Sequence, residues 1–208
     1  MAGVPRRPAG AARRATGSAA ANTGASGDNS EHADLNTVGP GTAIATVTAV
    51  NINVRPATAD DAARIEPALV NSWGSTMVVA HGTEYDLTAL PTLVAEHAGE
   101  LVGVLSYDLD GDALEVVTID AIDRRRGVGS ALIAAATDEA RKRGCRRLWL
   151  VTTNDNLDAL RFYQRRGLRI VGVTPDGIEH ARQLKPAIPD VGEYGIPIRD
   201  ELTLELLL

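Results

Sequence analysis

The sequence IDAIDRRRGVGSAL, at residues 119–132, joins a strand to a helix through a turn that contains two glycines. Residues 112–120 are typical of a strand, and apolar residues recur at helical spacing from Gly127 to Arg143. The start of a helix exposes unpaired N–H groups with a partial positive charge, so it can bind an anion such as a pyrophosphate. Gly127 and Gly129 lack a Cβ atom, which lets the backbone approach a phosphate group closely.

The spacing of this turn excludes two common phosphate-binding loops. A P-loop requires Gly-Lys-Ser/Thr after a four-residue spacer, and a dinucleotide-binding fingerprint requires a third glycine where Leu132 stands. On its own, the tripeptide at 127–129 is better explained as an ordinary helix start beside a solvated run of arginines. The interpretation of the turn therefore depends on whether a second motif accompanies it.

Such a motif lies about thirty residues further on, where residues 154–168 read NDNLDALRFYQRRGL. Asn156, Ala159 and Tyr163 are spaced by three and four residues, so they share one face of the predicted helix. A glycine at 167 is the predicted stop of that helix. Taken alone, a tyrosine at such a position is more often a core residue than a catalyst.

Strands and helices alternate around the two motifs. Before the glycine turn we expect a strand near 50–55, a helix from about residue 60, a short strand at 77–80, and an antiparallel meander at 92–97, 101–109 and 112–120. After the turn we expect helices at 127–143, 155–166 and 176–184 and strands at 146–153, 168–173 and 200–206. The final strand alternates acidic or polar residues with leucine, so we expect one of its faces to be exposed to solvent.

Composition narrows the function classes. The chain has 208 residues, 44% of them hydrophobic but only 3% aromatic, and a net charge of −6. It lacks the basic field that non-specific nucleic-acid binding needs, and it has no apolar run long enough to span a membrane as a helix. One cysteine, Cys145, excludes an internal disulfide and a cysteine-cluster metal site. It fits a reducing compartment, and we expect a cytoplasmic protein.

Together the two motifs resemble those of the GNAT family of acyl-CoA-dependent N-acyltransferases, and the order of predicted elements is also similar. The resemblance covers about residues 50–173, with the final strand plausible as well. It implies an α/β fold in which a central, mixed but mostly antiparallel sheet is flanked by helices. That sheet splays between its fourth and fifth strands, which here are 112–120 and 146–153.

The resemblance also implies that acetyl-CoA is the co-substrate and that no metal takes part. The pantetheine arm would lie in the splay and hydrogen-bond to the backbone of the fourth strand, while Asn156 would hold the pantetheine or the sheet edge. The residues that the resemblance assigns to acetyl-CoA are Val117, Thr118, Ile119, Arg124, Arg125, Arg126, Gly127, Val128, Gly129, Ser130 and Asn156.

Acetyl transfer to an amine needs a base for the ammonium proton and an acid for the departing thiolate. Tyr163 matches the general acid of the family, although packing against the pantetheine arm is its alternative role. Many family members carry a glutamate base where this chain has Ala113. Glu115 lies two residues later on the same strand face, where it could act directly, through a water, or simply pair with an arginine.

The sequence therefore predicts a disordered extension at 1–49, rich in Ala, Gly and Ser, and a GNAT N-acetyltransferase domain at 50–208. We expect acetyl transfer from acetyl-CoA directly to a primary amine, with no nucleic-acid or membrane partner. A non-catalytic acyl-CoA-binding module and an enzyme using a longer acyl-CoA stay open as alternatives. The final strand could pair across an interface, so a homodimer and a monomer are both open.

Overall fold

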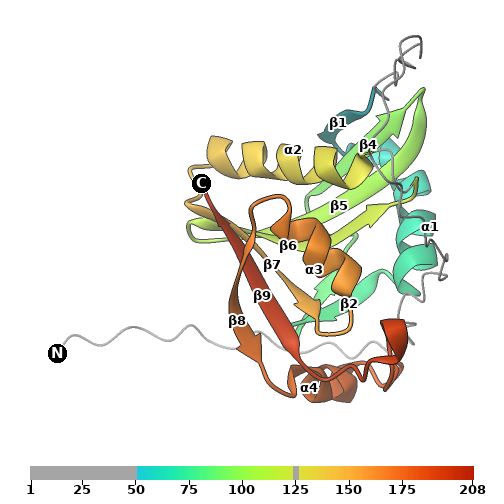
Figure 1. Cartoon of the computed structure of the whole chain (residues 1–208). Helices are drawn as coiled ribbons and strands as arrows, with labels where there is room; N and C mark the ends of the chain where they lie inside the picture. The colour runs from blue at the N-terminus through green and yellow to red at the C-terminus, as the bar shows by residue number, and fades with distance from the viewer. Residues whose placement is uncertain (1–50, 124–126) are drawn as a thin grey trace, which may run out of the picture.

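The computed structural model describes residues 51–123 and 127–208. The extension predicted at 1–49 and the three arginines at 124–126 lie outside these residues. The described chain forms a seven-stranded sheet in the order β1-β4-β5-β6-β7-β9-β8 and a separate two-stranded sheet, β2-β3 (Figure 1). Neighbouring strands of the large sheet are antiparallel except β6 and β7, which are parallel, so the predicted mixed sheet is confirmed.

The strands and α-helices occur in the predicted order with one addition, the strand β3, which forms a hairpin with β2. The strands are β1 Asn53–Pro56, β2 Met77–Ala80, β3 Thr83–Asp86, β4 Thr92–His97, β5 Glu100–Asp110, β6 Ala113–Ala121, β7 Arg147–Thr153, β8 Arg169–Thr174 and β9 Glu201–Leu207. The α-helices are α1 Ala62–Trp73, α2 Val128–Lys142, α3 Leu157–Gln164 and α4 Gly177–Leu184.

The large sheet carries a hydrophobic core on each face. Val104 and Leu105 are neighbours on β5, so their side chains point to opposite faces. Leu105 belongs to the larger core, which contains α2 residues such as Leu132 and also Tyr163 of α3. Val104 belongs to a smaller core with Leu69 of α1 and residues of the β2–β3 hairpin. Helices α2 and α3 therefore cover one face, and α1 with the hairpin covers the other.

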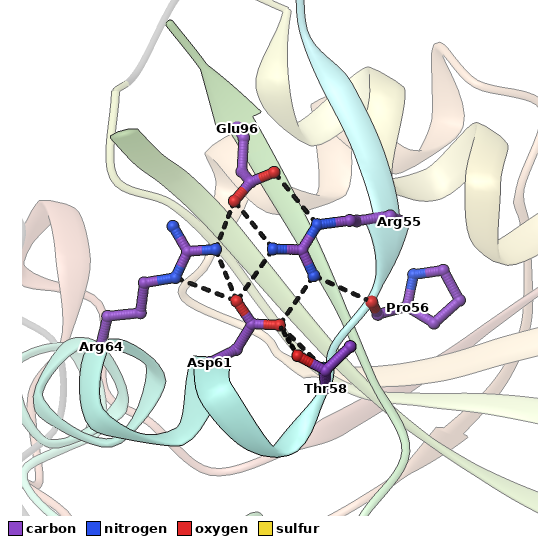
Figure 2. Close-up of polar contacts among 6 residues, drawn as sticks. All are labelled: Arg55, Pro56, Thr58, Asp61, Arg64 and Glu96. Carbon is purple, nitrogen blue, oxygen red and sulfur yellow. Dashed lines mark hydrogen bonds and ion pairs between the residues drawn. The ribbon is translucent and has the colours of Figure 1, made fainter. Parts of the chain in front are cut away.

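A network of four charged side chains fixes α1 against the sheet (Figure 2). The Asp61 carboxylate is buried and accepts from Arg55 Nη1 at 2.7 Å, Arg55 Nη2 at 2.9 Å and Arg64 Nε at 3.0 Å. Both arginines also reach Glu96 on β4. These contacts, together with the Thr58 backbone N–H at 2.8 Å from Asp61 Oδ2, hold the pKa of Asp61 well below its usual range.

One expectation about the sheet is wrong. The alternating pattern of the final strand left it free to pair across an interface, but β9 lies between β7 and β8 and is paired on both sides. The chain passes from β7 through α3 to β8, and β9 then returns antiparallel into the space between these two strands. Strand β8 is therefore one edge of the sheet, with Ile170, Val171 and Val173 exposed.

Candidate active site

The parallel strands β6 and β7 separate after the first three residues of each strand. Within the described strands their pairing joins Ala113–Glu115 to Arg147–Trp149 and goes no further. Beyond that point β6 continues to Ala121 and β7 to Thr153, so a fork opens in the sheet where Glu115 faces Trp149. This fork is the splay that the resemblance implies between the strands predicted at 112–120 and 146–153, which are β6 and β7.

A β-bulge on β6 lies directly inside the fork. The register against β5 pairs Tyr107 with Val116 but Ser106 with Thr118, so Val117 is an extra residue on β6. A bulge leaves its extra residue outside the regular ladder and re-aims the side chains around it. Of the three β6 residues expected at the pantetheine, Val117 is therefore unpaired on both sides, whereas Thr118 and Ile119 are paired with β5 but not with β7.

The glycine turn forms the start of α2, at the far end of β6 from Glu115. Gly127 is the N-cap with φ of 84°, a left-handed conformation that favours glycine, and the space beside its Cα is open. Val128 is buried in the core below. The Ser130 hydroxyl accepts a hydrogen bond from Arg166 Nε at 3.1 Å, which connects α2 to the end of α3. The predicted contacts from Arg124, Arg125 and Arg126 fall outside the described residues.

The second motif forms α3, in which Asn156 and Tyr163 have different structural roles. Asn156 is the N-cap, and its side-chain oxygen accepts from the Ala159 backbone N–H at 3.1 Å. Tyr163 is buried in the larger core beside Phe162, whose ring it meets edge-on. Burial and then the charge of Asp120 on β6 raise the pKa of Tyr163, so its hydroxyl keeps its proton at neutral pH and above.

Glu115 is buried on the opposite face, and two side chains from the hairpin bind its carboxylate. His81 Nε2 lies 2.8 Å from Glu115 Oε1, and the Tyr85 hydroxyl donates to Glu115 Oε2 at 3.0 Å. The Tyr85 hydroxyl also lies 3.1 Å from His81 Nε2. The three side chains come from β6, from β3 and from the turn between β2 and β3. The position that usually carries the glutamate in the family, Ala113, is buried at the closed end of the fork.

The turn that carries His81 is tied down to the sheet. The His81 backbone N–H donates to Glu201 Oε1 on β9 at 3.0 Å, and the imidazole packs on the Trp149 ring with their centroids 5.3 Å apart. The hydrogen bond to Glu115 is the main cause that raises the pKa of His81, and the charge of Glu201 acts in the same direction. Burial and Glu115 raise the pKa of Tyr85.

Sequence reasoning did not find His81, Tyr85 or Glu201 as site residues. One signal in the sequence could have indicated the hairpin. His81 and Gly82 separate two runs with strand character, and two residues are the length of a tight hairpin turn. His81 and Glu84 alone supply only half of a metal site. Within residues 51–123 and 127–208 no cluster of three metal-ligating side chains occurs. Among the same residues no helix is long and apolar enough to cross a membrane.

The chain is similar to known acetyltransferases. The family model for the acetyltransferase (GNAT) family matches residues 60–168. An uncharacterized protein of Bacillus subtilis, YdhI, is 43% identical over 105 residues, which cover 50% of this chain and 66% of YdhI. Streptothricin acetyltransferase of Streptomyces lavendulae is 33% identical over 98 residues, which cover 45% of this chain and 51% of that protein.

Solved structures show the same fold. A GNAT family acetyltransferase from Elizabethkingia anophelis, solved with acetyl-CoA bound, superposes with a TM-score of 0.58. The match covers 76% of this chain and 99% of that chain, at 20% sequence identity. At this level of identity the likeness establishes the arrangement of the sheet and helices.

Proposed function

The chain belongs to the GNAT acetyltransferase family, and we propose that it transfers an acetyl group from acetyl-CoA to a primary amine. The observation that carries this proposal is the fork between β6 and β7, which has a buried carboxylate network on one face and Tyr163 on the other. A thioester lying in the fork would meet both groups, as a direct transfer requires.

The features around the fork support acetyl-CoA as the donor. The start of α2 supplies unpaired N–H groups and a partial positive charge for a pyrophosphate, and the open space beside Gly127 leaves room for it. From there β6 leads toward Glu115, and its bulge at Val117 leaves backbone groups for the pantetheine arm and the thioester oxygen. A single strand therefore joins the two ends of the proposed site.

The chemistry needs two proton transfers, and the two faces of the fork each supply one. The amine nitrogen attacks the acetyl carbon only after it has lost the ammonium proton, because the pKa of an alkylammonium is about 10. The hydrogen-bonded group of Glu115, His81 and Tyr85 would accept that proton. The carbon–sulfur bond then breaks, and Tyr163 would give its proton to the departing CoA thiolate, since the hydroxyl stays protonated near neutral pH.

Two measurements test the proposal. Saturating acetyl-CoA and CoA should each raise the melting temperature of the full chain, while NAD should not. At a hundredfold excess over Kd, the added free energy of unfolding is about 2.7 kcal/mol. A thiol-release assay with a panel of primary amines, streptothricin included because one relative carries that name, should then detect turnover. Stabilisation without turnover on any amine would contradict the transferase activity and leave an acyl-CoA-binding protein.

The proposal extends to the location of the protein. Cys145 is a free, buried thiol, which fits a reducing compartment such as the cytoplasm. Fractionation of cells that express the protein would check this.

A further inference from the structure

We propose that His81 is the group that takes the proton from the acceptor amine, and that Glu115 and Tyr85 position its imidazole for this step. The inference rests on the proposed function, because it assigns the base of that same reaction. It is carried by the geometry of the β2–β3 turn and by the two hydrogen bonds that converge on Glu115.

The first argument is the conformation of the turn. Ala80 pairs with Thr83, so the hairpin has a two-residue turn made of His81 and Gly82. Both residues have positive φ, 40° and 78°, as a type I′ turn requires. Asn or Gly is favoured at the first of these positions, and a histidine there is held at a cost in stability. Such a residue persists where the surrounding structure constrains it, and this pattern is common at functional sites.

The second argument is the orientation of the ring. A carboxylate can only accept, so the Nε2 atom that faces Glu115 carries the hydrogen of the neutral imidazole. The lone pair of the neutral ring is then on Nδ1, which can accept a proton from the substrate. The carboxylate stabilises the imidazolium that forms, as in other pairs of histidine with a carboxylate.

The third argument is access. The His81 side chain keeps 31% of its surface exposed, whereas the Glu115 side chain keeps 7%. An ammonium group that approaches the fork from solvent therefore meets the imidazole before the carboxylate. Since the imidazole lies against Trp149, which faces Glu115 at the start of the fork, it is also beside the place proposed for the thioester.

The proton balance is complete with these groups. The ammonium proton passes to His81 Nδ1, the free amine forms a bond to the acetyl carbon, and the carbon–sulfur bond breaks. Tyr163 gives its proton to the thiolate. The nitrogen, which is positively charged after its attack, loses its second proton, and this proton returns through solvent to the tyrosinate. The imidazolium afterwards releases its proton to water, so the products are an N-acetylated amine and CoA with one proton released overall.

The charged and titratable groups that face His81 set the sign of the pH dependence. They are Glu115 on β6, Tyr85 on β3 and Glu201 on β9. The two carboxylates favour the imidazolium, so the base loses its lone pair as the pH falls through a value above the ordinary 6.5. The rate with a given amine should fall on that acidic side.

The experiment uses His81→Gly and His81→Asn, because both residues suit positive φ and should preserve the turn. His180→Gln, on the exposed surface of α4, is the matched control. We expect both His81 variants to bind acetyl-CoA as the wild type does and to lose about 10²–10⁴-fold in kcat/KM near pH 7. Their rates should rise tenfold per pH unit up to the pKa of the amine, whereas the wild-type rate should level off. Imidazole in the buffer should partly restore His81→Gly.

A readout that does not depend on activity is the titration of His81 monitored by NMR. Glu115→Gln should lower the pKa of His81, and His180→Gln should leave it unchanged. The inference is overturned if His81→Gly keeps wild-type kcat/KM and the wild-type pH profile. Absence of turnover in the wild type itself, on any amine, would instead remove the proposed function and this inference with it.

Discussion

Phe162 of α3 lies directly on Gly129 of α2, so that a Cβ atom at residue 129 would be 2.9 Å from the ring carbon Cζ. The same guanidinium that bonds Ser130 stacks over the Phe162 ring, with Arg166 Cζ 3.5 Å from its centroid. The two glycines of the turn therefore have separate causes. Gly127 has a left-handed backbone in open space, and Gly129 allows two helices to touch.

Gly129→Ala should destabilise the protein and weaken acetyl-CoA binding, because the new methyl group pushes α3 away from the start of α2. Overpacking of this kind costs about 1–3 kcal/mol. Chemical denaturation gives the loss of stability, and calorimetric titration gives the loss of affinity. Combining Gly129→Ala with Phe162→Leu should recover much of the stability, since the smaller side chain makes room. An unchanged Gly129→Ala variant would show that the two helices are not pressed together.

Tyr163→Phe should lower kcat by about 10²-fold while leaving acetyl-CoA binding close to wild type, because it deletes the proton for the thiolate and little packing surface. Burial and Asp120 raise the pKa of Tyr163, so the acid stays protonated through the alkaline range. The wild-type rate should therefore not fall between about pH 8 and pH 10. Steady-state rates across that range check both points, and a Phe variant at full speed would leave Tyr163 a packing residue.

Asp61→Asn should lower the melting temperature, because the two arginines would lose one of the two carboxylates that join them. The pKa of Asp61 is depressed in the folded protein, so its contribution to stability is complete above the unfolded value of about 4 and is lost as the pH falls below it. Melting curves between about pH 7 and pH 3 should show a steeper loss for the wild type than for Asp61→Asn. Asp60→Asn, which alters the exposed neighbour, should behave as the wild type.

The parts of the fold that the sequence predicted are those with local signals. The glycine turn before α2 and the helix from Asn156 to Tyr163 each depend on residues within a few positions of one another, and both occur as expected. The meander of β4, β5 and β6 was likewise predicted, and Gly111 and Asp112 form the turn between β5 and β6.

The parts that the sequence could not predict depend on contacts between distant segments. Nothing local shows that β9 enters between β7 and β8, because that order depends on pairing between segments that lie far apart in the sequence. Similarly, Glu115 was identified from its strand position, but the partners that bind it come from a hairpin well before it in the chain. The His81-Gly82 turn was overlooked because histidine is uncommon at its first position.

Thr118→Val should stabilise the free protein and weaken acetyl-CoA binding. Thr118 is buried on β6 inside the fork, and its hydroxyl has no hydrogen-bond partner in the part of the chain that the structure describes. A buried, unpaired hydroxyl costs about 1–3 kcal/mol, so an isosteric methyl group should raise the free energy of unfolding. If the pantetheine arm supplies the missing partner, the variant should lose about 5–10-fold in affinity, which corresponds to one hydrogen bond.

The matched control is Thr137→Val in α2, which is also buried but whose hydroxyl already donates to the Ile133 carbonyl at 2.8 Å. It should leave acetyl-CoA affinity unchanged and should not gain stability as Thr118→Val does. Denaturation curves and calorimetric titrations on both variants separate the two effects. Equal affinities for Thr118→Val and the wild type would mean that the hydroxyl does not contact the pantetheine arm, and that the contacts of this arm with β6 are made by the backbone.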